Sequence, residues 1–123
     1  MDKKTILITD DQYGIRRLLK EVFESRGITV LEASDGLQAI EKLHKHTVDL
    51  MLLDMKMPNL DGLSTLKVLK EKEIKVDVIF MTAYGEDRLT TEAKELGSNS
   101  HIFKPFDIEY VLEVVEKHLF NKK

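Results

Sequence analysis

Five polar side chains that could do chemistry together each follow a short apolar run of the chain. They are Asp10, Asp11, Asp54, Thr82 and Lys104. Carboxylates that lie close together repel one another, and a hard divalent cation such as Mg²⁺ relieves that repulsion through oxygen ligands. A hydroxyl and an ammonium opposite the carboxylates suit a phosphoryl group, whose oxygens need donors or positive charge. The residue types therefore predict Mg²⁺-dependent chemistry on phosphate, with Asp54 as the phosphoryl acceptor.

Each of these side chains has an ordinary alternative when it is considered alone. Asp11 could be the N-cap of the helix that follows it, and it could do both jobs. Thr82 could be a strand-end threonine, and Lys104 could be a surface lysine. The combination favours a functional site, because the carboxyl ends of parallel strands meet at one edge of a sheet, where such folds bind their ligands.

The elements that must position these residues alternate between apolar runs and amphipathic stretches. The segment 48–53 is nearly continuously apolar, as expected of a strand buried on both faces, and it ends at Asp54. Further strands are predicted at 5–9, 28–31, 76–81 and 101–103. Five strands that alternate with five helices predict one α/β domain with three layers and a parallel sheet.

Helical spacing of apolar residues predicts which side chains face the core. The first helix should bury a stripe made of Ile15, Leu18, Leu19, Val22 and Phe23. The second helix should begin at Asp35-Gly36 and bury Leu37, Ile40 and Leu43. Asp107 is expected to cap the last helix.

The bulk composition limits the class of protein. The 123 residues are 42% hydrophobic, which suits a single domain over 1–123 without an output domain. The absence of cysteine excludes thiol nucleophiles and disulfides and is typical of a reducing compartment. The net charge of −3 argues against a nucleic-acid-binding surface. Because no apolar run approaches the roughly 20 residues of a membrane span, a cytoplasmic domain is expected.

The chain resembles the receiver domain of two-component response regulators, the CheY-like family, over essentially its whole length. The matching motifs are Ile-Leu-Ile-Thr-Asp-Asp at 6–11, Leu-Leu-Asp-Met-Lys-Met-Pro at 52–58, Asp-Gly at 61–62, Met-Thr-Ala at 81–83 and Lys-Pro at 104–105. The resemblance implies a (βα)5 fold whose five-stranded parallel sheet has the order 2-1-3-4-5, with helices on both faces.

The resemblance also implies a metal site and a modified residue. Asp54 would carry the phosphoryl group as 4-aspartylphosphate. Asp11 and Asp54 would bind Mg²⁺ through their carboxylates, the Lys56 backbone carbonyl would be a third ligand, and Asp10 would act mostly through water. Other divalent cations such as Mn²⁺ or Ca²⁺ could take the same place.

The family assigns the remaining roles to Lys104, which would pair with phosphoryl oxygens, and to Thr82, which would hydrogen-bond one of them. The Lys104–Pro105 bond could be cis, as the resemblance suggests. Two positions depart from the family pattern. Thr9 stands where many relatives have valine. His101 stands at the position of the family's switch aromatic, and it is either a titratable switch residue or a half-buried strand histidine.

A narrower resemblance concerns the segments 11–16, 81–86 and 104–108, which are similar to single-domain regulators of the sporulation phosphorelay in spore-forming bacteria. It implies a monomer that takes phosphate from a sensor histidine kinase, delivers it to a histidine phosphotransferase and could meet a phosphatase. The docking surface should surround the site, and apolar candidates for it are Ile15, Tyr84, Pro105 and Phe106. Ile15 could equally pack in the core, whereas Phe106 is expected to face solvent.

Three other functions compete with this interpretation. A Mg²⁺-dependent phosphatase or phosphotransferase enzyme with an aspartyl nucleophile would need an acid two residues after Asp54, and Lys56 occupies that position. A flavodoxin-like cofactor binder would need a Gly-rich phosphate loop, and the chain has none. An interaction module that does not use phosphorylation is disfavoured because the acidic set is complete.

Overall fold

The computed structural model describes residues 3–120, so both ends of the expected 1–123 domain lie outside the described residues. Strands and helices alternate along the chain in the order β1 Thr5–Thr9, α1 Tyr13–Glu24, β2 Thr29–Ala33, α2 Gly36–Lys45, β3 Leu50–Asp54, α3 Gly62–Glu71, β4 Asp77–Ala83, α4 Asp87–Glu95, β5 Ser100–Lys104 and α5 Ile108–Phe120. Among these helices none is long and apolar enough to cross a membrane.

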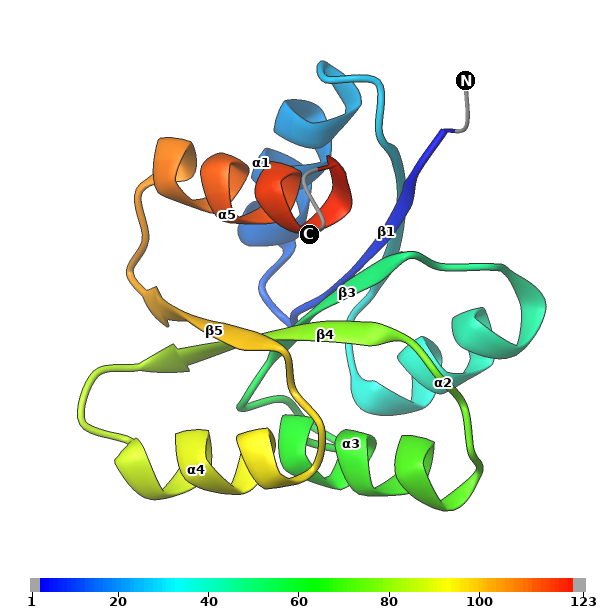
Figure 1. The fold of residues 1–123 in the computed structure, drawn as a ribbon, viewed down its shortest axis with the longest axis vertical. Helices are drawn as coiled ribbons and strands as arrows, with labels where there is room; N and C mark the ends of the chain where they lie inside the picture. Colours follow the sequence, from blue (N-terminus) through cyan, green and yellow to red (C-terminus); the bar gives the residue numbers. More distant parts are fainter. Residues whose placement is uncertain (1–2, 121–123) are drawn as a thin grey trace.

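The five strands form one parallel sheet in the order β2-β1-β3-β4-β5 (Figure 1). This order and the alternation of strands and helices confirm the predicted fold. In register, Thr9 at the end of β1 is paired with Leu53, and Asp54 at the end of β3 is paired with Met81. The residues that follow β1, β3, β4 and β5 therefore lie along the same edge.

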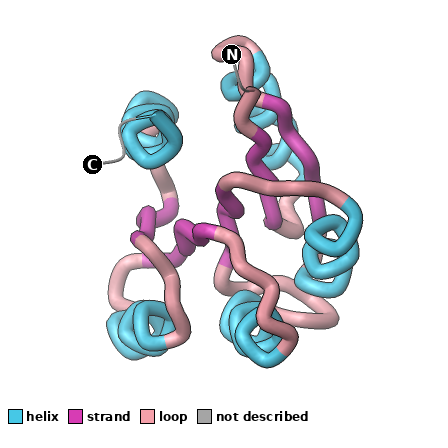
Figure 2. Tube along the Cα trace, turned by 45° about the vertical axis from the view of Figure 1, so that its right-hand side comes forward, coloured by secondary structure: helices cyan, strands magenta, loops and turns pink. Residues whose placement is uncertain are grey.

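The sheet separates two cores, and helices cover both of its faces (Figures 1 and 2). On one face Ile6 and Ile8 belong to a buried cluster with side chains of α1 and α5. On the other face Leu7 belongs to a cluster with side chains of α2, α3 and α4. Successive strand residues point to opposite faces, which explains why the central strands are apolar at nearly every position. All five residues of β3 are buried.

Two leucines that the helical spacing assigned to the core are on the surface. Leu18 is 45% exposed and Leu37 is 58% exposed. Leu19 in α1 and Ala39 in α2, one and two positions further along, are among the buried residues of these helices. Because successive residues of a helix are rotated by about 100°, Leu18 points away from the direction that Leu19 takes, and the apolar stripe is narrower than predicted.

The connection from β3 to α3 holds Asp54 from behind. The Gly62 N–H donates to the Met55 carbonyl at 2.9 Å, and a Cβ added to Gly62 would lie 2.5 Å from the Asp54 carbonyl oxygen. Asn59, which has a φ of 67°, donates its amide to Asp35 Oδ2 at 2.6 Å. The second half of the loop is therefore tied both to the end of β3 and to the N-terminus of α2.

Candidate functional site

The three predicted acidic side chains meet at the carboxyl edge of the sheet. Asp10 and Asp11 follow β1, Asp54 ends β3, and one carboxylate oxygen from each lies within 4.8 Å of the others. Asp10 and Asp54 are buried, whereas Asp11 is exposed. Oxygen ligands at this spacing, with one side open to solvent, suit a hard cation that keeps part of its water shell.

Asp11 is not the N-cap of α1, which was its ordinary alternative. The helix begins at Tyr13, and the N-cap position is Gln12, which makes no side-chain capping bond. The Gln12 N–H instead donates to Asp10 Oδ1 at 2.9 Å. The Asp11 carboxylate is thus directed to the acidic cluster and has no capping role.

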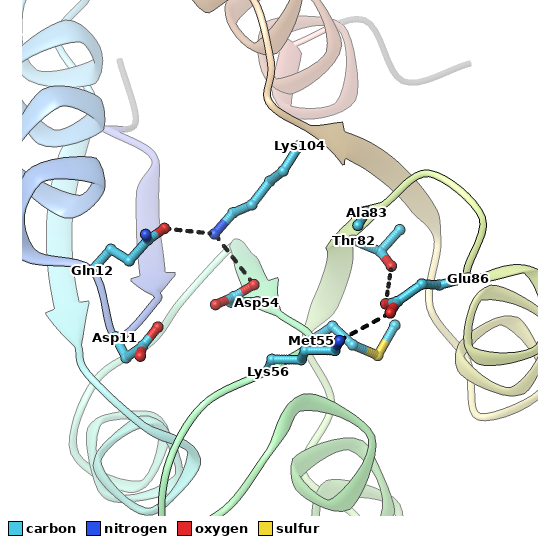
Figure 3. Close-up of a pocket in the computed structure, with 9 residues that line it drawn as sticks. All are labelled: Asp11, Gln12, Asp54, Met55, Lys56, Thr82, Ala83, Glu86 and Lys104. Carbon is cyan, nitrogen blue, oxygen red and sulfur yellow. Dashed lines mark hydrogen bonds and ion pairs between the residues drawn. The ribbon is translucent and has the colours of Figure 1, made fainter.

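Lys104 is a site residue rather than a surface lysine. From the end of β5 its ammonium reaches Asp10 Oδ2 at 2.7 Å, Asp54 Oδ1 at 3.3 Å and the Gln12 side-chain oxygen at 3.3 Å. Figure 3 shows the lysine extending across the cavity between Gln12 and Asp54. The ammonium therefore offsets two buried carboxylates before any cation binds.

The charge environment raises the pKa of Asp54 to about 6. Burial is the main cause, and the neighbouring carboxylate of Asp10 adds to it, with a smaller contribution from Asp11; Lys104 acts in the opposite direction. At neutral pH the Asp54 carboxylate is ionised and poorly solvated. An anion in that state gains from any positive charge or donor that reaches it, which makes it a suitable nucleophile toward phosphorus.

Arg16 is a supporting residue that sequence reasoning missed. Its guanidinium donates to the Asp10 carbonyl at 2.7 Å and to Glu32 Oε1 at 3.1 Å. It therefore ties the loop after β1 to the strand β2. Arg16 ends the matching segment 11–16, but no role was predicted for it, because its partner on β2 is 16 residues away and the pairing depends on how α1 packs.

The opposite wall of the cavity is made by the end of β4 and by residues that follow β3 and β4. The Thr82 hydroxyl donates to Glu86 Oε1 at 3.3 Å, and the Lys56 ammonium lies 3.0 Å from Glu86 Oε2 (Figure 3). The cavity has a volume of about 280 Å³, and Asp11, Asp54, Thr82 and Lys104 contribute to its lining together with Lys56 and Glu86. The space suffices for a small anion with its metal, and Glu86 is a further residue that the sequence analysis missed.

The four predicted docking residues differ in exposure. Tyr84 is 72% exposed and stacks on Phe103 with ring centroids 4.3 Å apart, and Pro105 is exposed. Ile15 and Phe106 are half-buried, and both pack against the core between the sheet and α5. Phe106 therefore faces solvent only in part.

Three further sequence observations have a place in the structure. The Lys104–Pro105 bond is cis. His101 is half-buried and meets the edge of Phe103, with centroids 4.9 Å apart. Among residues 3–120 the buried Thr9 hydroxyl has no hydrogen-bond partner, so the departure from valine leaves a polar atom unsatisfied there.

Known proteins share both the sequence pattern and the fold of this chain. Residues 6–116 match the response regulator receiver domain family. The chain belongs to that family. This receiver domain is 49% identical over 119 residues to sporulation initiation phosphotransferase F of Bacillus subtilis, covering 97% of this chain and 96% of the relative. It is 36% identical over 115 residues to chemotaxis protein CheY of the same organism, covering 93% and 96%.

Solved structures show the same fold. A receiver domain of the Francisella response regulator 1452 superposes on this one with a TM-score of 0.89 and 30% sequence identity, covering 98% of this chain and all of that one. The expected family is thus confirmed. The rival interpretation as an aspartyl phosphatase is not favoured, since the residue two positions after Asp54 is a lysine whose ammonium pairs with Glu86.

Proposed function

We propose that this receiver domain accepts a phosphoryl group on Asp54 from the phosphohistidine of a sensor histidine kinase and passes it to a histidine phosphotransferase, as in a sporulation phosphorelay. The observation that carries the proposal is the cluster in which Asp54 meets the Asp10 and Asp11 carboxylates and the Lys104 ammonium, beside a cavity that the Thr82 hydroxyl also lines. The similarity to a sporulation initiation phosphotransferase supports the relay role.

The chemical step is an in-line displacement at phosphorus. An Asp54 carboxylate oxygen forms the new O–P bond while the P–N bond of the donor breaks, and the imidazole nitrogen keeps that electron pair and takes a proton from solvent. Lys104 offers positive charge to the phosphoryl oxygens, and Thr82 donates a hydrogen bond to one of them. The reverse displacement, by a histidine of the acceptor protein, returns Asp54 to its carboxylate form.

The donor set suits Mg²⁺, which Asp11, Asp54 and the Lys56 backbone carbonyl would hold, with Asp10 acting through water. When bound, the ion would neutralise charge on the phosphoryl oxygens. Mn²⁺ or Ca²⁺ would be accepted by the same oxygen ligands. The fold itself holds these carboxylates so close together that they repel one another, and a bound cation offsets that repulsion.

Lys56 is proposed to control water access to the modified Asp54. Its ammonium lies at the mouth of the cavity, where the side chain is 76% exposed and paired with Glu86. A relay needs the acyl phosphate to survive until the next protein arrives. If Lys56 blocks or polarises water, Lys56→Ala will change the hydrolysis half-life of the aspartyl phosphate, and an unchanged half-life contradicts this role.

Partners are proposed to dock around the cavity, because the donor histidine must reach Asp54. Tyr84 and Pro105 offer exposed apolar surface there, and Ile15 and Phe106 continue it from the edge of the core. Phe106→Ala should slow phosphoryl transfer from the kinase while small-molecule phosphodonors react at the normal rate. We further propose that residues 1–123 act as one monomeric receiver unit in the cytoplasm, and the cysteine-free composition supports a reducing compartment.

The experiment that tests the function is phosphorylation followed by site mapping. The protein is incubated with Mg²⁺ and acetyl phosphate, and the modified peptide is identified by mass spectrometry. We expect the modification on Asp54 and none in Asp54→Asn, while Asp87→Asn, which alters an exposed carboxylate outside the cavity, is modified normally. Modification elsewhere, or none in the wild type, contradicts the proposal. Transfer of a labelled phosphoryl group from the kinase to this protein, and from it to a histidine phosphotransferase, then tests the relay itself.

A further inference from the structure

Glu86 puts a fourth carboxylate at the rim of the phosphoryl cavity. It lies immediately before α4, yet its side chain makes no capping bond to that helix. The carboxylate turns toward the cavity instead, where one oxygen accepts from the Thr82 hydroxyl at 3.3 Å and the other lies 3.0 Å from the Lys56 ammonium. Figure 3 shows it bridging these two side chains, and only 22% of it is exposed.

This bridge occupies Thr82, which would donate to an arriving phosphoryl group, and Lys56, whose ammonium lies at the mouth of the same cavity. On that wall of the cavity, Thr82 supplies the hydroxyl and Lys56 supplies the ammonium. A phosphoryl group carries about −1.5 to −2 charge at neutral pH, so it would repel the Glu86 carboxylate and compete with it for both partners. Both interactions are charge-assisted, so their loss has a measurable cost.

We propose that Glu86 is a positioning residue that holds Thr82 and Lys56 in the unmodified receiver and must release them when Asp54 is phosphorylated. The proposal rests on the proposed function of Asp54. Because the carboxylate is paired only in the unmodified state, it opposes the phosphorylated one. Removing its charge should therefore favour occupation of the cavity by a phosphoryl group.

The release is expected to reach the first turn of α4. The Glu86 carbonyl accepts from the Thr90 N–H at 3.1 Å and from the Thr90 hydroxyl at 3.1 Å. The side chain that contacts the cavity and the backbone that starts α4 thus belong to one residue. A displacement of the Glu86 side chain should be visible at the Thr90 amide.

The test uses beryllofluoride, an inert stand-in for the phosphoryl group, titrated in Mg²⁺ into the wild type and Glu86→Gln and followed by NMR of the backbone amides. Glutamine keeps the shape and removes the charge. We expect beryllofluoride to bind Glu86→Gln on the order of fivefold more tightly than the wild type. The shift of the Thr90 amide resonance on binding should be smaller in Glu86→Gln than in the wild type. Asp87→Asn removes a neighbouring exposed charge that contacts neither Thr82 nor Lys56 within residues 3–120, and its affinity should equal that of the wild type.

A second pair of variants separates positioning from general charge. In a Thr82→Val background the gain from Glu86→Gln should shrink, because one of the two released partners is gone. An undiminished gain in affinity there, or an equal gain in Asp87→Asn, overturns the proposal in favour of simple repulsion.

If wild-type protein binds beryllofluoride and Glu86→Gln binds no more tightly, this inference fails alone. If neither protein binds it at Asp54, the proposed function fails as well. Thermal melts of each variant confirm that the fold is intact, and Glu86→Ala serves as the second charge-removing variant.

Discussion

Asp54 lies where burial and two neighbouring carboxylates act against a single ammonium. These opposing effects leave the pKa of Asp54 raised, and the raised pKa affects the stability of the fold. A group whose pKa is higher in the folded chain than in the unfolded chain stabilises the fold when it is protonated, and this contribution is lost as the pH rises through the folded pKa. Ionisation of Asp54 therefore lowers the free energy of unfolding of the metal-free receiver.

Asp54→Asn should stabilise the metal-free protein near neutral pH. Since the pKa rises from 3.8 to about 6, the wild type should be less stable than Asp54→Asn above about pH 6, by up to about 3 kcal/mol. The difference should shrink as the pH falls, and it should vanish below the unfolded pKa. Urea unfolding in the presence of a chelator measures it, and a difference that does not vary with pH contradicts the prediction.

Replacing Thr9 with valine should stabilise the fold. The buried hydroxyl of Thr9 has no partner in the described part of the chain. Thr9→Val therefore removes an unsatisfied group at nearly constant volume and should raise the free energy of unfolding by about 1 kcal/mol. The matched control is Thr65→Val. The Thr65 hydroxyl is also buried but donates to the Asp61 carbonyl at 2.7 Å, so the same substitution should lower stability there. Equal effects at both positions would exclude this explanation.

At the scale of elements, the site depends on how the strands end and how the next helices begin. Asp61 caps α3 by accepting from the Ser64 N–H at 2.8 Å, and Asp35 caps α2 by accepting from the Gln38 N–H at 2.9 Å. The Asp35 pKa is lowered, mainly by that backbone hydrogen bond and then by Asn59. These caps fix the start of the helices that precede and follow β3, the strand that carries Asp54.

Gly62→Ala should disturb this connection. The added methyl would lie 2.5 Å from the Asp54 carbonyl oxygen and 3.0 Å from Met55 Cα, which the backbone cannot accommodate without a shift. We expect a loss of about 1–3 kcal/mol in the free energy of unfolding. Gly14→Ala in α1 meets no atom within 4 Å, so it should gain roughly 0.5 kcal/mol from helix propensity. Denaturant melts of both variants test the contrast, and a tolerated Gly62→Ala contradicts it.

The sequence was informative wherever a local pattern decides the structure. Strand ends that carry Asp54, Thr82 and Lys104 were predictable, because apolar runs stop at those positions and a parallel sheet brings such ends together. Leu18 was misplaced, since the edge of an apolar stripe depends on how the helix packs. Glu86 was not predictable, because its role comes from where the loop after β4 places it relative to Lys56, 30 residues earlier in the chain.

At the scale of the whole molecule, one sheet supports two cores, which share no buried side chain within residues 3–120. The cluster on the α1 and α5 face contains Phe23 and Val115, and the cluster on the other face contains Phe80 and Leu66. The strand order that makes this possible follows from the family and not from periodicity, which indicates the number of strands but not their neighbours. The acidic cluster lies at the edge of the sheet, between the two layers of helices.

Mg²⁺ should stabilise the whole receiver through that edge. A ligand that binds only the folded state adds about 2.7 kcal/mol at a concentration a hundredfold above its dissociation constant. We expect the melting temperature to rise with Mg²⁺ in the wild type and much less in Asp11→Asn, which alters an exposed carboxylate of the cluster. Asp87→Asn should respond like the wild type. A Mg²⁺ response that survives Asp11→Asn would remove that carboxylate from the ligand set.

The Lys104 ammonium, 2.7 Å from Asp10 Oδ2 and 3.3 Å from Asp54 Oδ1, is a counter-ion that the polypeptide carries with it. Because this positive charge is part of the chain, we expect the sheet to form in metal-free buffer. A cation that binds the aspartates would compete with the ammonium for Asp10 and Asp54. We expect the ammonium, once displaced, to be free to pair with the oxygens of an incoming phosphoryl group.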